Sequence, residues 1–258
     1  MLNHQRQGAG QTVVLLHGLF GSCRYWSFLV DYLSPTYDVV SLDLPGFGDS
    51  STVPVPKNVA GYGAVVFEFL QSLGIESFSV LGHSLGGAIA QQMSLDYPDE
   101  INKMVAYATK PAVLDEDRFE SFEKTLDRIL NSDIDDVVKS QAANWFDAGA
   151  DAQHFQLCLD AAQGVTSASA GACVQAIRGW DVRDQLDKLE MPVLIVSGDR
   201  DRSVSLETLV GEKQAIKNAQ LSILPGCGHM AHLESPQVFN QVIHEFISAP
   251  KKNKSKIA

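Results

Sequence analysis

A serine between two glycines is the first feature of this sequence that could carry out chemistry. Residues 82–86 have the sequence GHSLG, a G-x-S-x-G pattern. The apolar run Phe78–Leu81 before it is typical of a strand, and the amphipathic run Leu85–Tyr97 after it is typical of a helix. A turn this tight leaves no room for side chains at its glycines and exposes the serine hydroxyl at the carboxyl end of the strand. The pattern predicts that Ser84 is a nucleophile; the alternative is a glycine-rich turn with an incidental serine.

A serine hydroxyl is a poor nucleophile unless a base takes its proton, and histidine is the usual base. His229, His232 and His244 follow the late strand-like run Val193–Ser197. His229 lies in a glycine-containing loop after a further strand-like run, at the sheet edge where the sites of open α/β sheets collect. We therefore expect His229 to be the base. His232 is the weaker candidate, and His244 is expected to be a surface or packing residue of the final helix.

The base needs an acid that fixes its tautomer. Asp199 and Asp201 both follow the run Val193–Ser197, so both leave the carboxyl end of a predicted strand. Reasoning from these residues alone does not separate the two carboxylates.

Two backbone N–H groups could stabilise a negatively charged oxygen beside the serine. Leu85 begins the predicted helix, and Leu19 lies in the loop after the first strand-like run. Pre-organised N–H donors of this kind form an oxyanion hole. The neighbouring His17 is expected to be structural, with its ring hydrogen-bonded inside the loop.

Short apolar runs alternate with longer amphipathic runs along most of the chain. This order is typical of a mostly parallel sheet with helices on both faces, so the predicted fold class is α/β. The predicted strands are Val13–Leu16, Tyr37–Leu42, Phe78–Leu81, Lys103–Ala108, Val193–Ser197 and Leu221–Leu224. The predicted helices are Cys23–Leu33, Asn58–Leu73, Leu85–Tyr97, Ser205–Lys217 and Pro236–Ser248.

One long interval has helical patterns but no strand-like run. It covers residues 111–180, and a structureless loop of that length is improbable in a compact domain. We expect an inserted helical lid there, with residues 1–110 and 181–250 forming the α/β core. Residues 251–258 are expected to be a basic, disordered tail.

The charge balance argues against nucleic acid and anionic membranes as partners. The chain has 20 Lys and Arg against 31 Asp and Glu, a formal net charge of -11. No apolar run approaches the ~18 residues of a membrane span, and the N-terminal residues 1–11 are polar. The 4 cysteines lack metal-binding spacing. We expect a cytoplasmic protein with no metal and no cofactor, whose oligomeric state one sequence does not reveal.

Five segments together resemble the successive signatures of the α/β-hydrolase superfamily. The resemblance extends from residue 13 to about 248, nearly the whole chain. The segments are residues 17–21 (HGLFG), 43–50 (DLPGFGDS), 82–87 (GHSLGG), 198–201 (GDRD) and 228–229 (GH).

The resemblance has consequences for the acid and for the N-terminus. In this family the acid usually lies three residues after the glycine that ends the strand, which implies Asp201 rather than Asp199. The family's first two strands should precede Val13. We expect the first to be missing and the second to be a short strand near Leu2–Arg6.

The resemblance implies a serine hydrolase of carboxylic esters with Ser84, His229 and Asp201 as its triad. Large apolar residues of the lid and the loops are expected to surround a small ester substrate. The tentative pocket residues are Phe20, Phe119, Phe122, Trp145, Phe146 and Met230.

Two alternatives remain open. The first is a carbon–carbon bond hydrolase or lyase acting on an acidic metabolite, which would place Arg118, Arg128 or Arg178 opposite the serine. Relatives of those classes often carry a Trp where Met230 stands, or an Arg where Ala88 stands. The second is a ligand sensor of the same fold with slow turnover. A serine at position 84 excludes the members with an aspartate nucleophile.

Overall fold

The computed structural model describes residues 1–117 and 120–250 of the chain. These residues form a seven-stranded sheet in the order β1-β3-β2-β4-β5-β6-β7. The tail 251–258 and Phe119 lie outside the described residues. The strands are β1 His4–Gln7, β2 Thr12–Leu16, β3 Asp38–Leu42, β4 Phe78–His83, β5 Ile101–Tyr107, β6 Val193–Gly198 and β7 Ala219–Leu224.

The sheet is parallel except at one edge, which confirms the predicted fold class. β2 to β7 pair in parallel, whereas β1 pairs antiparallel with β3, and His4 lies opposite Leu42. β1 is the short N-terminal strand expected near residues 2–6. Arg6 holds it in place, because its Nε donates to Asp38 Oδ1 at 2.8 Å.

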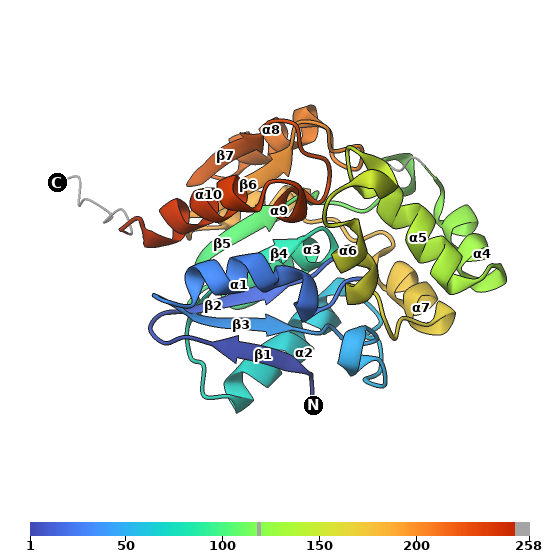
Figure 1. Cartoon of the computed structure of the whole chain (residues 1–258). Coiled ribbons are helices and arrows are strands. Elements are labelled where there is room, and N and C mark those ends of the chain that lie inside the picture. Colours follow the sequence, from blue (N-terminus) through green and yellow to red (C-terminus); the bar gives the residue numbers. More distant parts are fainter. Residues whose placement is uncertain (118–119, 251–258) are drawn as a thin grey trace.

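Helices cover both faces of the sheet (Figure 1). Side chains alternate along each strand, so Val13 and Leu15 face one apolar core while Val14 and Leu16 face the other. Helices α1, α9 and α10 pack on the first of these cores, and α2, α3 and α8 pack on the second. The helices of this part are α1 Ser27–Leu33, α2 Val59–Ser72, α3 Leu85–Asp96, α8 Leu206–Ala215, α9 Ala231–Glu234 and α10 Pro236–Ser248.

Between β5 and β6 the described chain forms helices and no strand of the sheet. These helices lie together beside one end of the sheet (Figure 1). An isolated backbone bridge between Ala112 and Asp181 joins the two ends of the segment. The helices are α4 Phe122–Asn131, α5 Ile134–Trp145, α6 Phe155–Ala161 and α7 Ser167–Ile177.

Side-chain caps begin several of these helices where the sequence offers a short polar residue. Such a side chain accepts a hydrogen bond from an N–H of the first turn that has no partner within the helix. α4 is capped by Ser121, α5 by Asp133, α7 by Thr166 and α8 by Ser205.

Candidate active site

Ser84 occupies a strained turn between β4 and α3. Its φ of 53° and ψ of -112° are unusual for a residue with a side chain, and such strain is common at functional sites. A Cβ added to Gly82 would lie 2.0 Å from Gly86 O, and one added to Gly86 would lie 2.3 Å from Leu16 O. Only glycine fits at either position, so strand and helix can meet closely enough to present the serine.

The backbone of this turn is fixed, while the hydroxyl is not. The Ser84 N–H donates to Tyr107 O at 2.9 Å, and Thr109 Oγ1 donates to Ser84 O at 2.8 Å. Among residues 1–117 and 120–250, no side chain or backbone group hydrogen-bonds to Ser84 Oγ. Ser84 is half-buried, and its hydroxyl is free to bind a ligand. Catalytic hydrogen bonds of unliganded enzymes often tighten only in the complex.

His229 is hydrogen-bonded to the acid that the family spacing implied. Its Nδ1 lies 2.9 Å from Asp201 Oδ2. The Ser203 N–H donates to Asp201 Oδ1 at 2.7 Å, and the Ser197 hydroxyl donates to Oδ2 at 3.0 Å. Burial raises the pKa of Asp201, but the charge and hydrogen bond of His229 and these two donors outweigh it, so the pKa is lowered. An ionised Asp201 only accepts, so Nδ1 carries the proton and Nε2 is left free to act as a base.

Asp199 has a different set of contacts. Its Oδ1 accepts from the N–H groups of Gly226 and Cys227, at 2.7 and 3.3 Å. The structure brings together His229 and Asp201, whereas Asp199 holds the loop that precedes the histidine.

Within residues 1–117 and 120–250, no other histidine hydrogen-bonds to Asp201. His232 is buried, and burial lowers its pKa to about 3, so it is neutral. The His244 ring lies between those of Tyr32 and Tyr37, with centroids 5.9 and 6.1 Å away. His17 accepts at Nε2 from the Leu44 N–H at 2.9 Å, so its Nδ1 carries a proton and donates to Gly18 O.

The two candidate oxyanion donors belong to segments that adjoin the serine. Leu85 is the first residue of α3, where backbone N–H groups point out of the helix without internal partners. The loop of Leu19 packs against the turn, because a Cβ on Gly18 would lie 3.2 Å from Ser84 Cβ. Within the described chain, neither the Leu85 N–H nor the Leu19 N–H has a hydrogen-bond acceptor. Both can meet a developing negative charge.

The predicted pocket residues fall into two groups. Phe20 and Trp145 lie near the histidine: the Trp145 ring centroid is 6.0 Å from that of His229 and 6.1 Å from that of Phe20. The remaining described members, Phe122, Phe146 and Met230, are fully buried among core side chains.

The end of α5 is attached to the histidine loop. The His229 N–H donates to Trp145 O at 2.7 Å. Glu234 bridges the same two segments, since it accepts from the Asp147 N–H and from the Gly228 N–H, both at 2.7 Å. Sequence reasoning missed Glu234, because its partner Asp147 lies 87 positions away along the chain.

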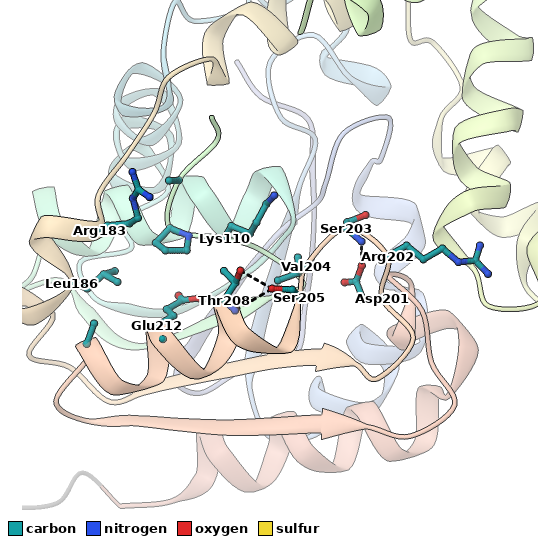
Figure 2. Close-up of a pocket in the computed structure, with 14 residues that line it drawn as sticks. Lys110, Arg183, Leu186, Asp201, Arg202, Ser203, Val204, Ser205, Thr208 and Glu212 are labelled. Carbon is teal, nitrogen blue, oxygen red and sulfur yellow. Dashed lines mark hydrogen bonds between the residues drawn. The ribbon is translucent and has the colours of Figure 1, made fainter. Parts of the chain in front are cut away.

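A cavity of about 620 Å³ lies beside the acid Asp201 (Figure 2). Asp201 lines it, but Ser84 and His229 do not. Thr208 and Glu212 line the cavity from α8, and Lys110 also lines it (Figure 2).

Glu212 is the unusual group in this cavity. It is 2% exposed, and neither carboxylate oxygen has a hydrogen-bond partner among the described residues. Burial raises the pKa of Glu212 to about 8, so the carboxyl is protonated at neutral pH. Helical spacing could have revealed it, because Glu212 lies three residues after Leu209 and four before Ile216, both of them core residues.

The described residues hold neither a metal-binding cluster nor a membrane-spanning helix. No group of three His, Cys, Asp or Glu side chains in residues 1–117 and 120–250 is arranged to hold a metal ion. In the same residues, no helix has the length and apolar character needed to cross a membrane.

Comparison with known proteins identifies the family. The model of the alpha/beta hydrolase fold family matches residues 11–145 and 161–236. The chain belongs to this family.

The similar proteins differ in what they act on. The chain is 26% identical to a pimeloyl-[acyl-carrier protein] methyl ester esterase of Pseudoalteromonas atlantica, over 90% of this chain and 92% of that protein. It is 24% identical to a 2-hydroxy-6-oxo-6-phenylhexa-2,4-dienoate hydrolase of Comamonas testosteroni, over 93% and 92%. A solved hydrolase of Pseudomonas aeruginosa superposes with a TM-score of 0.88 at 24% identity, covering 96% of this chain and 94% of that one. That likeness supports the fold alone.

Proposed function

We propose that this protein is a serine hydrolase that cleaves carboxylic esters through an acyl-enzyme. The observation that carries the proposal is the 2.9 Å hydrogen bond between His229 and Asp201 at the sheet edge where the strained Ser84 turn exposes its hydroxyl. A buried acid, a histidine with a free Nε2 and a serine in such a turn are the parts of a Ser-His-Asp triad.

These groups can share the chemistry as follows. Ser84 Oγ attacks the ester carbonyl carbon while His229 Nε2 takes the hydroxyl proton. The N–H groups of Leu85 and Leu19 stabilise the oxyanion, and the ester C–O bond breaks as His229 returns the proton to the leaving alcohol. Water then attacks the acyl-enzyme in the same way and releases the acid. Asp201 stays ionised and stabilises the imidazolium that forms in each step.

The segment 111–180 is proposed to be a lid over this site. Its α5 contributes Trp145, whose ring lies near those of Phe20 and His229. Aromatic side chains beside the catalytic histidine favour an uncharged acyl or aryl group.

Carbon–carbon bond cleavage is the second candidate, because one similar protein is named for such a substrate. That chemistry on an acidic metabolite would need a cation facing the serine. Arg128 instead pairs with Glu120 at 2.8 Å, and Arg178 pairs with Glu123 at 2.6 Å. Arg118 lies outside the described residues. The two described lid arginines are therefore engaged by lid acids, which favours the ester proposal.

A substrate series with a nucleophile variant tests the proposal. The wild-type protein should cycle on p-nitrophenyl esters, and each added buried methylene should raise kcat/KM by up to about fourfold, ~0.8 kcal/mol, until the pocket is full. Ser84→Ala should abolish both turnover and labelling by a fluorophosphonate probe. Ser140→Ala, an exposed serine on α5, should change neither.

Three results would contradict the proposal. Labelling retained in Ser84→Ala would remove Ser84 as the nucleophile. Faster cleavage of a vinylogous diketone than of any ester would favour the carbon–carbon reaction. A single stoichiometric burst without further turnover would favour the sensor.

A further inference from the structure

A chain of buried hydrogen bonds runs behind the active site and joins the oxyanion loop to His229. It begins at the Gly18 N–H, which donates to the Tyr25 hydroxyl. The Tyr25 hydroxyl lies 3.1 Å from His83 Nδ1, and His83 Nε2 lies 3.0 Å from His229 O. Tyr25 and His83 are each only 2% exposed. Neither side chain has a part in the proposed chemistry.

The two ends of this chain fix the direction of every bond in it. A backbone N–H can only donate, and a carbonyl oxygen can only accept. His83 therefore carries its proton on Nε2 and donates to His229 O. The Tyr25 hydroxyl accepts from Gly18 and donates its own proton to His83 Nδ1. Burial keeps the pKa of His83 well below its ordinary value, so the ring stays neutral and this arrangement persists.

A second tyrosine strengthens the far end. The Tyr107 hydroxyl donates to His229 O at 3.0 Å and accepts from the His232 N–H at 3.1 Å. Its one proton is thus committed, so His232 Nδ1, 3.0 Å away, must donate to it. With its own N–H bound to Trp145 O, the His229 backbone is held on both sides.

We propose that Tyr25 and His83 are positioning residues that set the oxyanion loop relative to the catalytic histidine. This inference rests on the proposed function, because it concerns the same site. Leu19, the oxyanion donor, directly follows Gly18, so a shift of the Tyr25 hydroxyl moves that N–H. A misplacement of about 1 Å can cost about a hundredfold in rate. The simpler interpretation is that both rings only fill the core.

A double-mutant cycle separates the two interpretations. Tyr25→Phe removes the hydroxyl, and His83→Gln keeps an amide that can donate to His229 O but no longer offers Nδ1 to Tyr25. Each variant should lower kcat by about ten- to a hundredfold, with KM changed less than about twofold. The double variant should be no slower than the slower single variant, because both break the same chain. Tyr62→Phe is the matched control, since this buried tyrosine bonds to Pro45 O.

A transition-state analogue supplies a readout that a structural role would not move. A boronic acid should bind Tyr25→Phe more weakly by the same factor as kcat/KM falls, whereas the product acid should bind unchanged. Losses that multiply in the double variant, or equal weakening of both ligands, would overturn the proposal.

A spectroscopic test needs no substrate, so it distinguishes failure of this inference from failure of the proposed function. ¹⁵N NMR of the wild-type protein should show His83 neutral with its proton on Nε2 between pH 5 and 9. A proton on His83 Nδ1 would overturn the proposed direction of the hydrogen-bond chain, even if the enzyme is an esterase. The inference would survive even if no ester is cleaved. Its support would then be the Nε2–H tautomer of His83 in the wild-type protein and the loss of the hydrogen bond at His83 Nδ1 in Tyr25→Phe.

Discussion

The two aspartates after β6 differ at the residue scale in burial and in what their carboxylates contact: Asp199 is exposed, whereas the Asp201 side chain is buried. Asp201 binds His229, and Asp199 binds two backbone N–H groups of the preceding loop. Asp201→Asn should lower kcat by about 10⁴, because an amide no longer stabilises the imidazolium or fixes its tautomer.

Asp199→Asn is the matched control for that variant. Its amide oxygen can still accept the two backbone hydrogen bonds, so the loss of kcat should be much smaller. Steady-state kinetics measure kcat of both variants. A larger loss of kcat in Asp199→Asn than in Asp201→Asn would mean that the triad acid is misassigned.

Glu212 makes stability depend on pH in a defined direction. Its pKa is about 8 in the folded protein against a reference value of 4.5. At pH values below 4.5, Glu212 is protonated in both the folded and the unfolded state, so it does not lower the free energy of unfolding. As the pH rises toward 8, the unfolded chain loses the proton first, so stability falls. Glu212→Gln does not titrate, and its advantage over wild type should be about 3 kcal/mol larger at pH 8 than at pH 5.

Chemical denaturation at the two pH values measures this difference. Glu207→Gln, an exposed position on the same helix, should show almost none. An equal effect of Glu212→Gln at both pH values would mean that the carboxyl finds a partner in solution.

At the scale of elements, the contact between α3 and the sheet depends on the absence of a side chain. A Cβ on Gly86 would lie 2.3 Å from Leu16 O, a backbone atom that cannot move aside cheaply. Gly86→Ala should therefore lower the free energy of unfolding by about 1–3 kcal/mol and impair labelling of Ser84.

Gly211 on α8 provides the opposite case, because nothing lies within 4 Å of a Cβ added there. Gly211→Ala should raise stability by about 0.5–1 kcal/mol, as alanine in a helix usually does. Urea titrations of the two variants should thus shift in opposite directions, and a shift in the same direction would contradict the packing argument.

At the scale of the whole molecule, a buried lysine ties the last helix to the middle of the sheet. Lys103 Nζ donates to Phe246 O at 2.9 Å, to Ile247 O at 2.6 Å and also to Ala249 O. These carbonyls end α10, where a positive charge is favourable. Lys103→Met should lower the free energy of unfolding by about 2–3 kcal/mol.

The exposed Lys139 on α5 is the control for this variant. Lys139→Met should change stability by less than about 0.5 kcal/mol. Equal urea midpoints for the two variants would show that α10 is held by its apolar face alone.

Local patterns in the sequence determined the fold class, most element boundaries and the position of the nucleophile turn. Six of the strands were predicted within two residues at each end, because each is a short apolar run that interrupts helical spacing. The G-x-S-x-G turn was equally local, since its two glycines and its serine act within five consecutive residues.

Tertiary structure alone decided which distant groups meet. Local patterns did not separate Asp199 from Asp201; the family spacing implied the second, and the fold shows why, because it brings the Asp201 carboxylate to the His229 ring. Nothing in the local sequence indicates that His83 shares a hydrogen-bonded chain with Tyr25, 58 positions earlier. Hydrogen bonds depend on distances of a few tenths of an ångström between segments far apart in sequence, which local periodicity does not encode.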